Sequence, residues 1–108
     1  MDEHTWQTRY KAAKPYGIRW MLHKATAEQV AAVDAHRDQL AGLLKNLPTD
    51  PADVRDQAAK LIAGDRADSF WRDTTGKEQD SVDLGDRSYL AGFIQGMLDA
   101  LSERITWH

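Results

Sequence analysis

A run of apolar residues at helical spacing in the last quarter of the chain is the feature that most constrains its fold. From Asp86 onward, apolar side chains recur every three or four positions and would cover one wide face of a helix. These residues are Tyr89, Leu90, Phe93, Ile94, Met97, Leu98, Leu101 and Ile105. The spacing predicts a long amphipathic helix over residues 86–106.

The same segment carries a strip of small residues at four-residue spacing, namely Gly92, Gly96 and Ala100. A glycine in a helix interior costs about 1 kcal/mol relative to alanine, so two of them suggest that another backbone comes close. We expect this strip to pack against a second small strip, which is formed by Ala27, Ala31 and Ala35. The alternative is that it forms a homodimer contact.

Capping residues and apolar spacing also indicate a helix between Thr26 and Leu47. Thr26 and Gln29 have the spacing of a capping box, and Pro48 stops a helix. Apolar residues recur between these ends at helical spacing: Val30, Val33, Leu40, Leu44 and Leu47. Arg37 interrupts that spacing and could pair with Asp34 or reach a partner chain. The pattern predicts one continuous helix over residues 26–47.

Two shorter helices are expected between the long ones. Asp50 suits an N-cap, Pro51 suits the first helical position, and Gly64 suits a left-handed C-cap, which together predict a helix over 51–63. A second short helix is expected over 66–72, with Phe70 and Trp71 as core anchors. Residues 73–85 are polar, show no sustained period and are interpreted as a loop.

The N-terminal segment, residues 1–25, gives the weakest structural signal. A short helix with Trp6 and Tyr10 one turn apart would end before Pro15. The apolar segment 18–22 would have no strand to pair with, so helix or irregular structure is expected there. We therefore predict a partly irregular, basic N-terminal segment.

These expectations combine into an all-α fold, a small single-domain helical bundle over residues 1–108. The length suits one domain, and 42% hydrophobic residues are enough for a core. Short connections favour antiparallel packing of neighbouring helices.

Charge divides the chain into a basic, aromatic head (residues 1–25) and an acidic body (residues 26–108). The net charge is −3, yet residues 4–24 contain five Lys and Arg and no acidic residue. The head either folds back onto the body or binds a partner. Its candidate partner-binding residues are Trp6, Arg9, Tyr10, Lys14, Arg19, Trp20 and Lys24. The alternative for the four head aromatics is that they fill the core, and at least two of the four are expected to be buried there. The candidate acidic surface is formed by Asp65, Asp68, Asp73, Asp80, Asp83 and Asp86.

Motifs for catalysis, cofactors and metals do not emerge from the sequence. There is no Cys, and no two of the four His have the spacing of a helical zinc pair. Gly76-Lys77 lacks the upstream Gly and the following Ser or Thr of a phosphate-binding loop. No Gly-x-Ser-x-Gly motif is present. We therefore expect no cofactor, no metal site and no enzymatic activity.

The interpretation that remains is a non-enzymatic regulator or inhibitor that binds a protein partner. A small phage or mobile-element protein that blocks a host nucleic-acid-binding complex would fit this size and lack of chemistry. The first alternative is a nucleic-acid-binding regulator that uses the basic aromatic head, because cations beside stacking rings suit single strands. The second is an enzyme or metal-dependent domain with a site that the sequence does not reveal. The apolar stretches are too short to span a membrane, and the N-terminus resembles no secretory signal, so a cytoplasmic location is expected.

Overall fold

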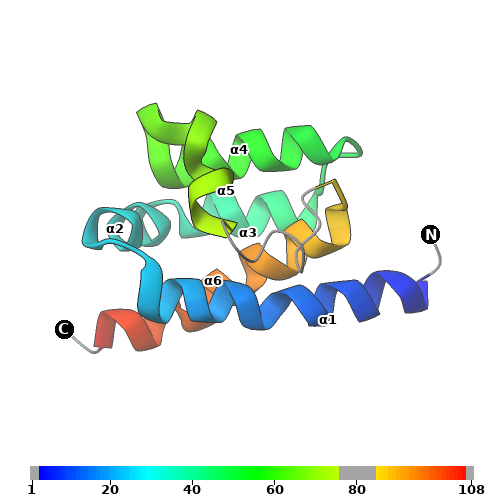
Figure 1. Ribbon diagram of the computed structural model, residues 1–108, viewed down its shortest axis with the longest axis horizontal. Helices are drawn as coiled ribbons and strands as arrows, with labels where there is room; N and C mark the ends of the chain where they lie inside the picture. The colour runs from blue at the N-terminus through cyan, green and yellow to red at the C-terminus, as the bar shows by residue number, and fades with distance from the viewer. Residues whose placement is uncertain (1–2, 76–84, 107–108) are drawn as a thin grey trace.

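The computed structural model describes residues 3–75 and 85–106, and helices are the only regular secondary structure in that part of the chain (Figure 1). Helix α1 (Glu3–Arg19) continues into a π-helical turn, η1 (Trp20–Lys24). The remaining elements are α2 (Ala27–Ala35), α3 (Arg37–Lys45), α4 (Pro51–Ala63), the 3₁₀ turn η2 (Gly64–Arg66), α5 (Ala67–Thr75) and α6 (Arg87–Thr106). The expected all-α bundle is confirmed.

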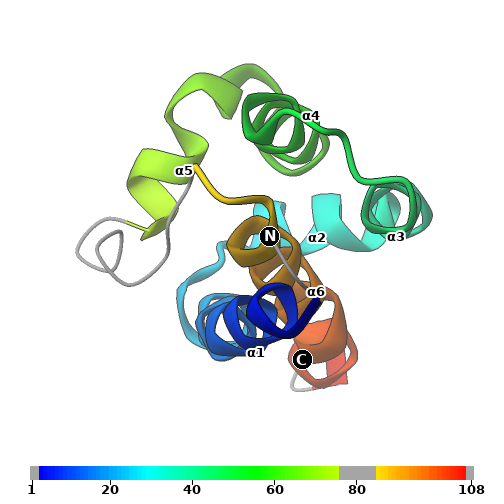
Figure 2. The ribbon, with the colours of Figure 1, turned by 90° about the vertical axis from the view of Figure 1, so that its right-hand side faces the viewer.

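Helix α6 occupies the middle of the fold. Figure 2 shows it between α1 on one side and the layer of α2, α3 and α4 on the other. Because α6 is covered from both sides, most of its residues from Leu90 to Leu101 are buried. The expected helix 86–106 is therefore present, with Asp86 just before its first residue.

The N-terminal segment is not irregular, which corrects the sequence-based prediction. Helix α1 runs through Pro15 without ending. Pro15 has no N–H group to donate to the carbonyl oxygen of Lys11, four residues earlier in the helix. Both residues are on the exposed side of α1, so the Lys11 carbonyl can accept a hydrogen bond from water instead. The opposite side of α1 buries Ala13 and Gly17 against α6, and this long contact outweighs the local cost of the proline.

The α1–α6 contact is parallel and very close. A Cβ atom added to Gly92 would lie 2.2 Å from the Tyr10 carbonyl oxygen, and one added to Gly96 would lie 2.2 Å from the Lys14 carbonyl oxygen. From the other side, a Cβ atom on Gly17 would lie 2.0 Å from the Phe93 carbonyl oxygen. The two helices therefore touch backbone to backbone, with no room for a side chain at these three positions.

This contact corrects one expectation. The small strip of α6 meets α1, whereas Ala27, Ala31 and Ala35 are exposed. The two helices run parallel, because Tyr10 and Lys14 of α1 meet Gly92 and Gly96 of α6 in the same order. The antiparallel rule holds for helices joined by short loops, and these two are separated by the rest of the chain.

The predicted helix 26–47 is two helices, because the chain bends at His36. The backbone there has φ −110° and ψ 20°, outside the α-helical region. The His36 ring nitrogen Nδ1 lies 3.0 Å from the Ala32 carbonyl oxygen and covers the end of α2. The bend lets Val33 of α2 and Leu40 of α3, both 0% exposed, reach one core from helices of different direction. Arg37 directly follows the bend, and its Nη1 atom lies 3.9 Å from Oδ1 of Asp34.

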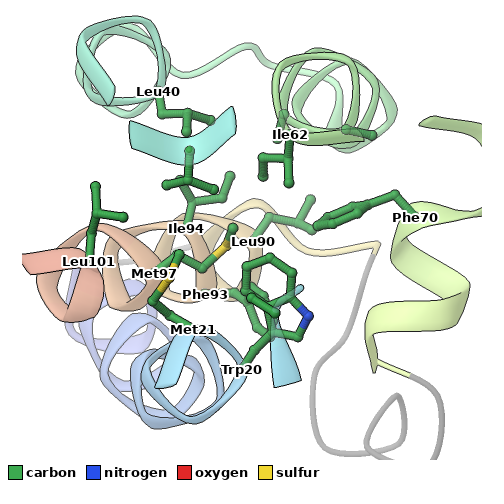
Figure 3. Close-up of a cluster of buried hydrophobic side chains, with 14 of the residues drawn as sticks. Trp20, Met21, Leu40, Ile62, Phe70, Leu90, Phe93, Ile94, Met97 and Leu101 are labelled. Atoms are coloured by element: carbon green, nitrogen blue, oxygen red, sulfur yellow. The ribbon is translucent and has the colours of Figure 1, made fainter. Parts of the chain in front are cut away.

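The shorter helices agree better with the sequence. Helix α4 has the predicted bounds, with Asp50 accepting a hydrogen bond from Ala52 N at 2.9 Å. Helix α5 extends to Thr75, beyond the expected 66–72. Phe70 and Trp71 are core residues as predicted, and they meet Trp20 and Phe93 in an aromatic cluster. Figure 3 shows Trp20, Phe70 and Phe93 of this cluster.

Candidate partner-binding surface

The basic head folds back onto α6 through polar contacts along its length. Arg9 forms an ion pair with Asp86 at the start of α6, and Lys14 Nζ lies 2.8 Å from an Asp99 carboxylate oxygen. At the far end, Arg104 donates a hydrogen bond to the Met21 carbonyl oxygen at 2.9 Å. Arg9 and Lys14 are thus paired with acidic residues at and within α6, as expected if the head packs against the acidic body.

Asp86 is a capping residue and not part of an open acidic surface, which corrects its assignment. Its carboxylate accepts a hydrogen bond from Ser88 N at 2.9 Å, and its carbonyl oxygen accepts one from Leu90 N at 3.1 Å. Burial by itself would raise the pKa of Asp86, but hydrogen bonds from Ser88 and Arg9 outweigh it and lower the pKa. The residue is 8% exposed, and its carboxylate caps the N-terminus of α6 and pairs with Arg9 of α1.

The contact with α6 also shifts the pKa values of two head residues, Lys14 and Tyr10. The hydrogen bond that Lys14 donates to the Asp99 carboxylate raises the pKa of the lysine. Burial raises the pKa of Tyr10, because the phenolate would lose hydration. Through the Lys14–Asp99 ion pair and the partial burial of Tyr10, this side of α1 takes part in the contact with α6.

The head aromatics do not form an open platform. Trp20 is 3% exposed and lies in the core, so its assignment as an interface residue is wrong (Figure 3). Trp6 stacks on Tyr10 with ring centroids 5.3 Å apart, and the Arg19 guanidinium lies 5.1 Å from the centre of the Tyr16 ring. Cations and rings alternate in the sequence, but in the structure each ring is already in contact with a side chain of the same chain.

What remains for a partner is the outer side of α1 and η1. Its exposed basic residues include Lys11, Arg19 and Lys24, and we call this set the cationic outer face. Glu3 stands at the first position of α1, and no acidic residue follows it between positions 4 and 24. The face follows a helix at the edge of the molecule, opposite α3 (Figure 2).

The other candidate acidic residues divide into two groups. Asp65, Asp68 and Asp73 are exposed, but Arg66 and Arg72 are exposed in the same short segment. Asp80 and Asp83 lie outside the described residues. The part of this surface that the structure describes therefore carries both signs of charge.

The small strip of α6 is also closed to partners. Gly92, Gly96 and Ala100 are buried within the chain, and α1 covers both glycines. The homodimer alternative for this strip is therefore wrong.

Sequence reasoning missed two hollows in the surface. A cavity of about 360 Å³ lies among α2, α4, η2 and α5, with Glu28, Arg66 and Asp73 on its walls and Phe70 among its apolar residues. A groove of about 480 Å³ runs between α3 and α4. Both are assembled from separate helices, so no local motif marks them.

Within residues 3–75 and 85–106, no three His, Cys, Asp or Glu side chains are placed to hold a metal ion. None of the helices in that part is long and apolar enough to cross a membrane.

Comparison with known proteins gives no match to a protein family, to a curated protein or to a solved structure.

Proposed function

We propose that this protein is a non-enzymatic regulator that docks its cationic outer face onto an acidic surface of a larger protein. The observation that supports the proposal is the position of Lys11, Arg19 and Lys24, which are exposed on α1 and η1 at the edge of the molecule. No acidic residue lies between positions 4 and 24. Complementary charge of this kind speeds association and selects the partner. A 108-residue domain bound in this way would act by covering or bridging sites on its target.

The surroundings of the rings favour a protein partner over a nucleic acid. Single-strand binding uses aromatic rings as stacking platforms, but Trp20 is in the core and Trp6 stacks on Tyr10. The net charge of −3 also opposes attraction to phosphates. An acidic protein surface needs only the exposed cations and therefore fits better.

The acidic residues Asp65, Asp68 and Asp73 offer another way to bind a target, in which their carboxylates would mimic the phosphates of a nucleic acid. Mimicry needs a surface of one sign, and the described part of that surface contains Arg66 and Arg72 beside its aspartates. A target that itself binds nucleic acid would be basic at the contact and would repel the cationic outer face. We therefore place the contact on α1 and η1 and expect the target to be acidic there.

The test is capture of partners by the tagged protein, with and without nuclease, compared between two charge-reversal variants. Lys11→Glu/Arg19→Glu reverses two charges of the cationic outer face and should abolish capture while helical circular dichroism persists. Arg66→Glu/Arg72→Glu makes the same charge change on η2 and α5 and should retain capture.

Equal capture by both variants would show that α1 is not the contact. Capture that disappears with nuclease would move the function to the nucleic-acid alternative.

A further inference from the structure

Gly42, in the middle of α3, has no internal reason to be glycine. Gly17, Gly92 and Gly96 are required by the close α1–α6 contact, and Gly64 has a positive φ of 53°. At Gly42 the φ is ordinary and an added Cβ atom would meet nothing within 4 Å. Because glycine weakens a helix relative to alanine, this position needs another explanation.

Gly42 opens onto the groove between α3 and α4. The groove measures about 480 Å³ and is lined by Gln39, Gly42, Leu43, Asn46, Gln57, Lys60 and Leu61. Residues 39, 42, 43 and 46 have the three- and four-residue spacing of one helix face. Helix α3 lies at the edge of the molecule, where a second helix can approach it (Figure 2).

The charges beside Gly42 indicate which helix would fit. Asp38 and Lys45 are exposed and seven residues apart, so they lie on the same flank of α3. The structure shows no ion pair for either of them with any other described residue. In an antiparallel pair of helices, equal flanks face each other. A second α3 crossing at Gly42 would therefore place Asp38 beside Lys45 of the other copy, twice by symmetry.

We propose that α3 is a self-association surface on which a second copy of this chain packs antiparallel, with Gly42 at the point of closest approach. The α1–α6 contact shows the same device within one chain, where glycine admits the backbone of another helix. The twofold arrangement is closed and self-complementary, as in most homodimers. Because α3 has nine residues, the contact is small and the dimer should form only at high concentration. Both copies would keep α1 exposed, since α1 lies opposite α3.

Sedimentation velocity of the intact protein from micromolar to millimolar concentration tests the proposal. The wild type should pass from monomer to dimer. Asp38→Lys and Lys45→Asp each place like charges together twice and should raise the dimer Kd by about tenfold or more. The double variant Asp38→Lys/Lys45→Asp restores opposite charges and should recover dimerisation.

Gly42→Leu provides a test that does not depend on charge. The open space around Gly42 lets the variant fold, but its side chain would hold the second helix away, so it should remain monomeric. The matched controls are Glu103→Lys and Lys11→Asp, which reverse exposed charges on α6 and α1 and should leave the dimer unchanged.

A wild type that stays monomeric at every concentration would overturn the proposal. A dimer that tolerates Gly42→Leu, or that the double charge variant fails to restore, would place the contact elsewhere. The proposed function is tested separately, because Lys11→Glu/Arg19→Glu removes the partner contact and leaves α3 intact.

Discussion

The same substitution, glycine to alanine, should have opposite effects at two helix positions of this protein. Gly96 lies in the middle of α6 and Gly42 in the middle of α3. A helix interior favours alanine over glycine by about 0.8–1.0 kcal/mol, so propensity alone predicts the same gain at both. Only the surroundings of the two residues differ.

At Gly96 the surroundings reverse the sign. The added Cβ atom would lie 2.2 Å from the Lys14 carbonyl oxygen and 2.9 Å from Ile18 N. Ordinary carbon–oxygen contacts are about 3.3–3.6 Å, so α1 and α6 would have to separate by about 1 Å. The obstacle is backbone, which cannot turn aside as a side chain can. Overpacking costs about 1–3 kcal/mol, and taking the upper value because the backbone is rigid leaves a net loss of about 2 kcal/mol after the propensity gain.

At Gly42 nothing opposes the gain. No atom lies within 4 Å of the added Cβ, so Gly42→Ala should stabilise the monomer by about 0.8 kcal/mol. The two variants should therefore differ by about 3 kcal/mol. Urea unfolding followed by helical circular dichroism measures this difference, at a concentration low enough to keep the protein monomeric. In thermal unfolding, about 2 kcal/mol corresponds to a fall in Tm of about 10 °C for Gly96→Ala. Equal stabilisation by both variants would refute the close α1–α6 contact.

Three further variants or conditions test the contacts around α1. Asp86→Ala should lower the free energy of unfolding by about 2 kcal/mol, which chemical denaturation measures. The substitution removes the N-cap of α6 and the ion pair with Arg9, and it leaves the buried Ser88 hydroxyl without an acceptor. The lowered pKa of Asp86 means that its stabilisation is complete above the unfolded value of 3.8 and is lost as pH falls through the folded value, so the acid decline in stability should be shallower in Asp86→Asn than in wild type. Trp20→Ala should cost about 3–5 kcal/mol, because the ring packs against Phe70 and Phe93 in the core, and a variant with an unchanged melting temperature would contradict that position.

Local signals were enough to predict helix α4 and the fold class. Asp50, Pro51 and Gly64 act on the backbone within one turn, so the bounds of α4 follow from residues close in sequence. The apolar spacing of α6 is equally local, and it predicts a long helix whatever covers it.

Where local and distant interactions compete, the sequence was misleading. Pro15 indicates a helix end, yet the contact with α6 carries α1 through it. The capping box at Thr26 and the apolar spacing indicate one helix to Leu47, yet packing on α6 bends the chain at His36. In both cases, burial of apolar surface against a distant element outweighs a backbone preference of a few kcal/mol.

The candidate surface shows the same division. The sequence by itself determined that residues 4–24 are basic and that Gly92 and Gly96 require a close neighbour. Only the tertiary structure decided that this neighbour is α1, that Trp20 belongs to the core, and that the outer cations rather than the aromatic rings are exposed. The physical reason is that charge and helical spacing are properties of neighbouring residues. Which faces become buried depends on which helices meet, and α1 and α6 meet across nearly the whole length of the chain.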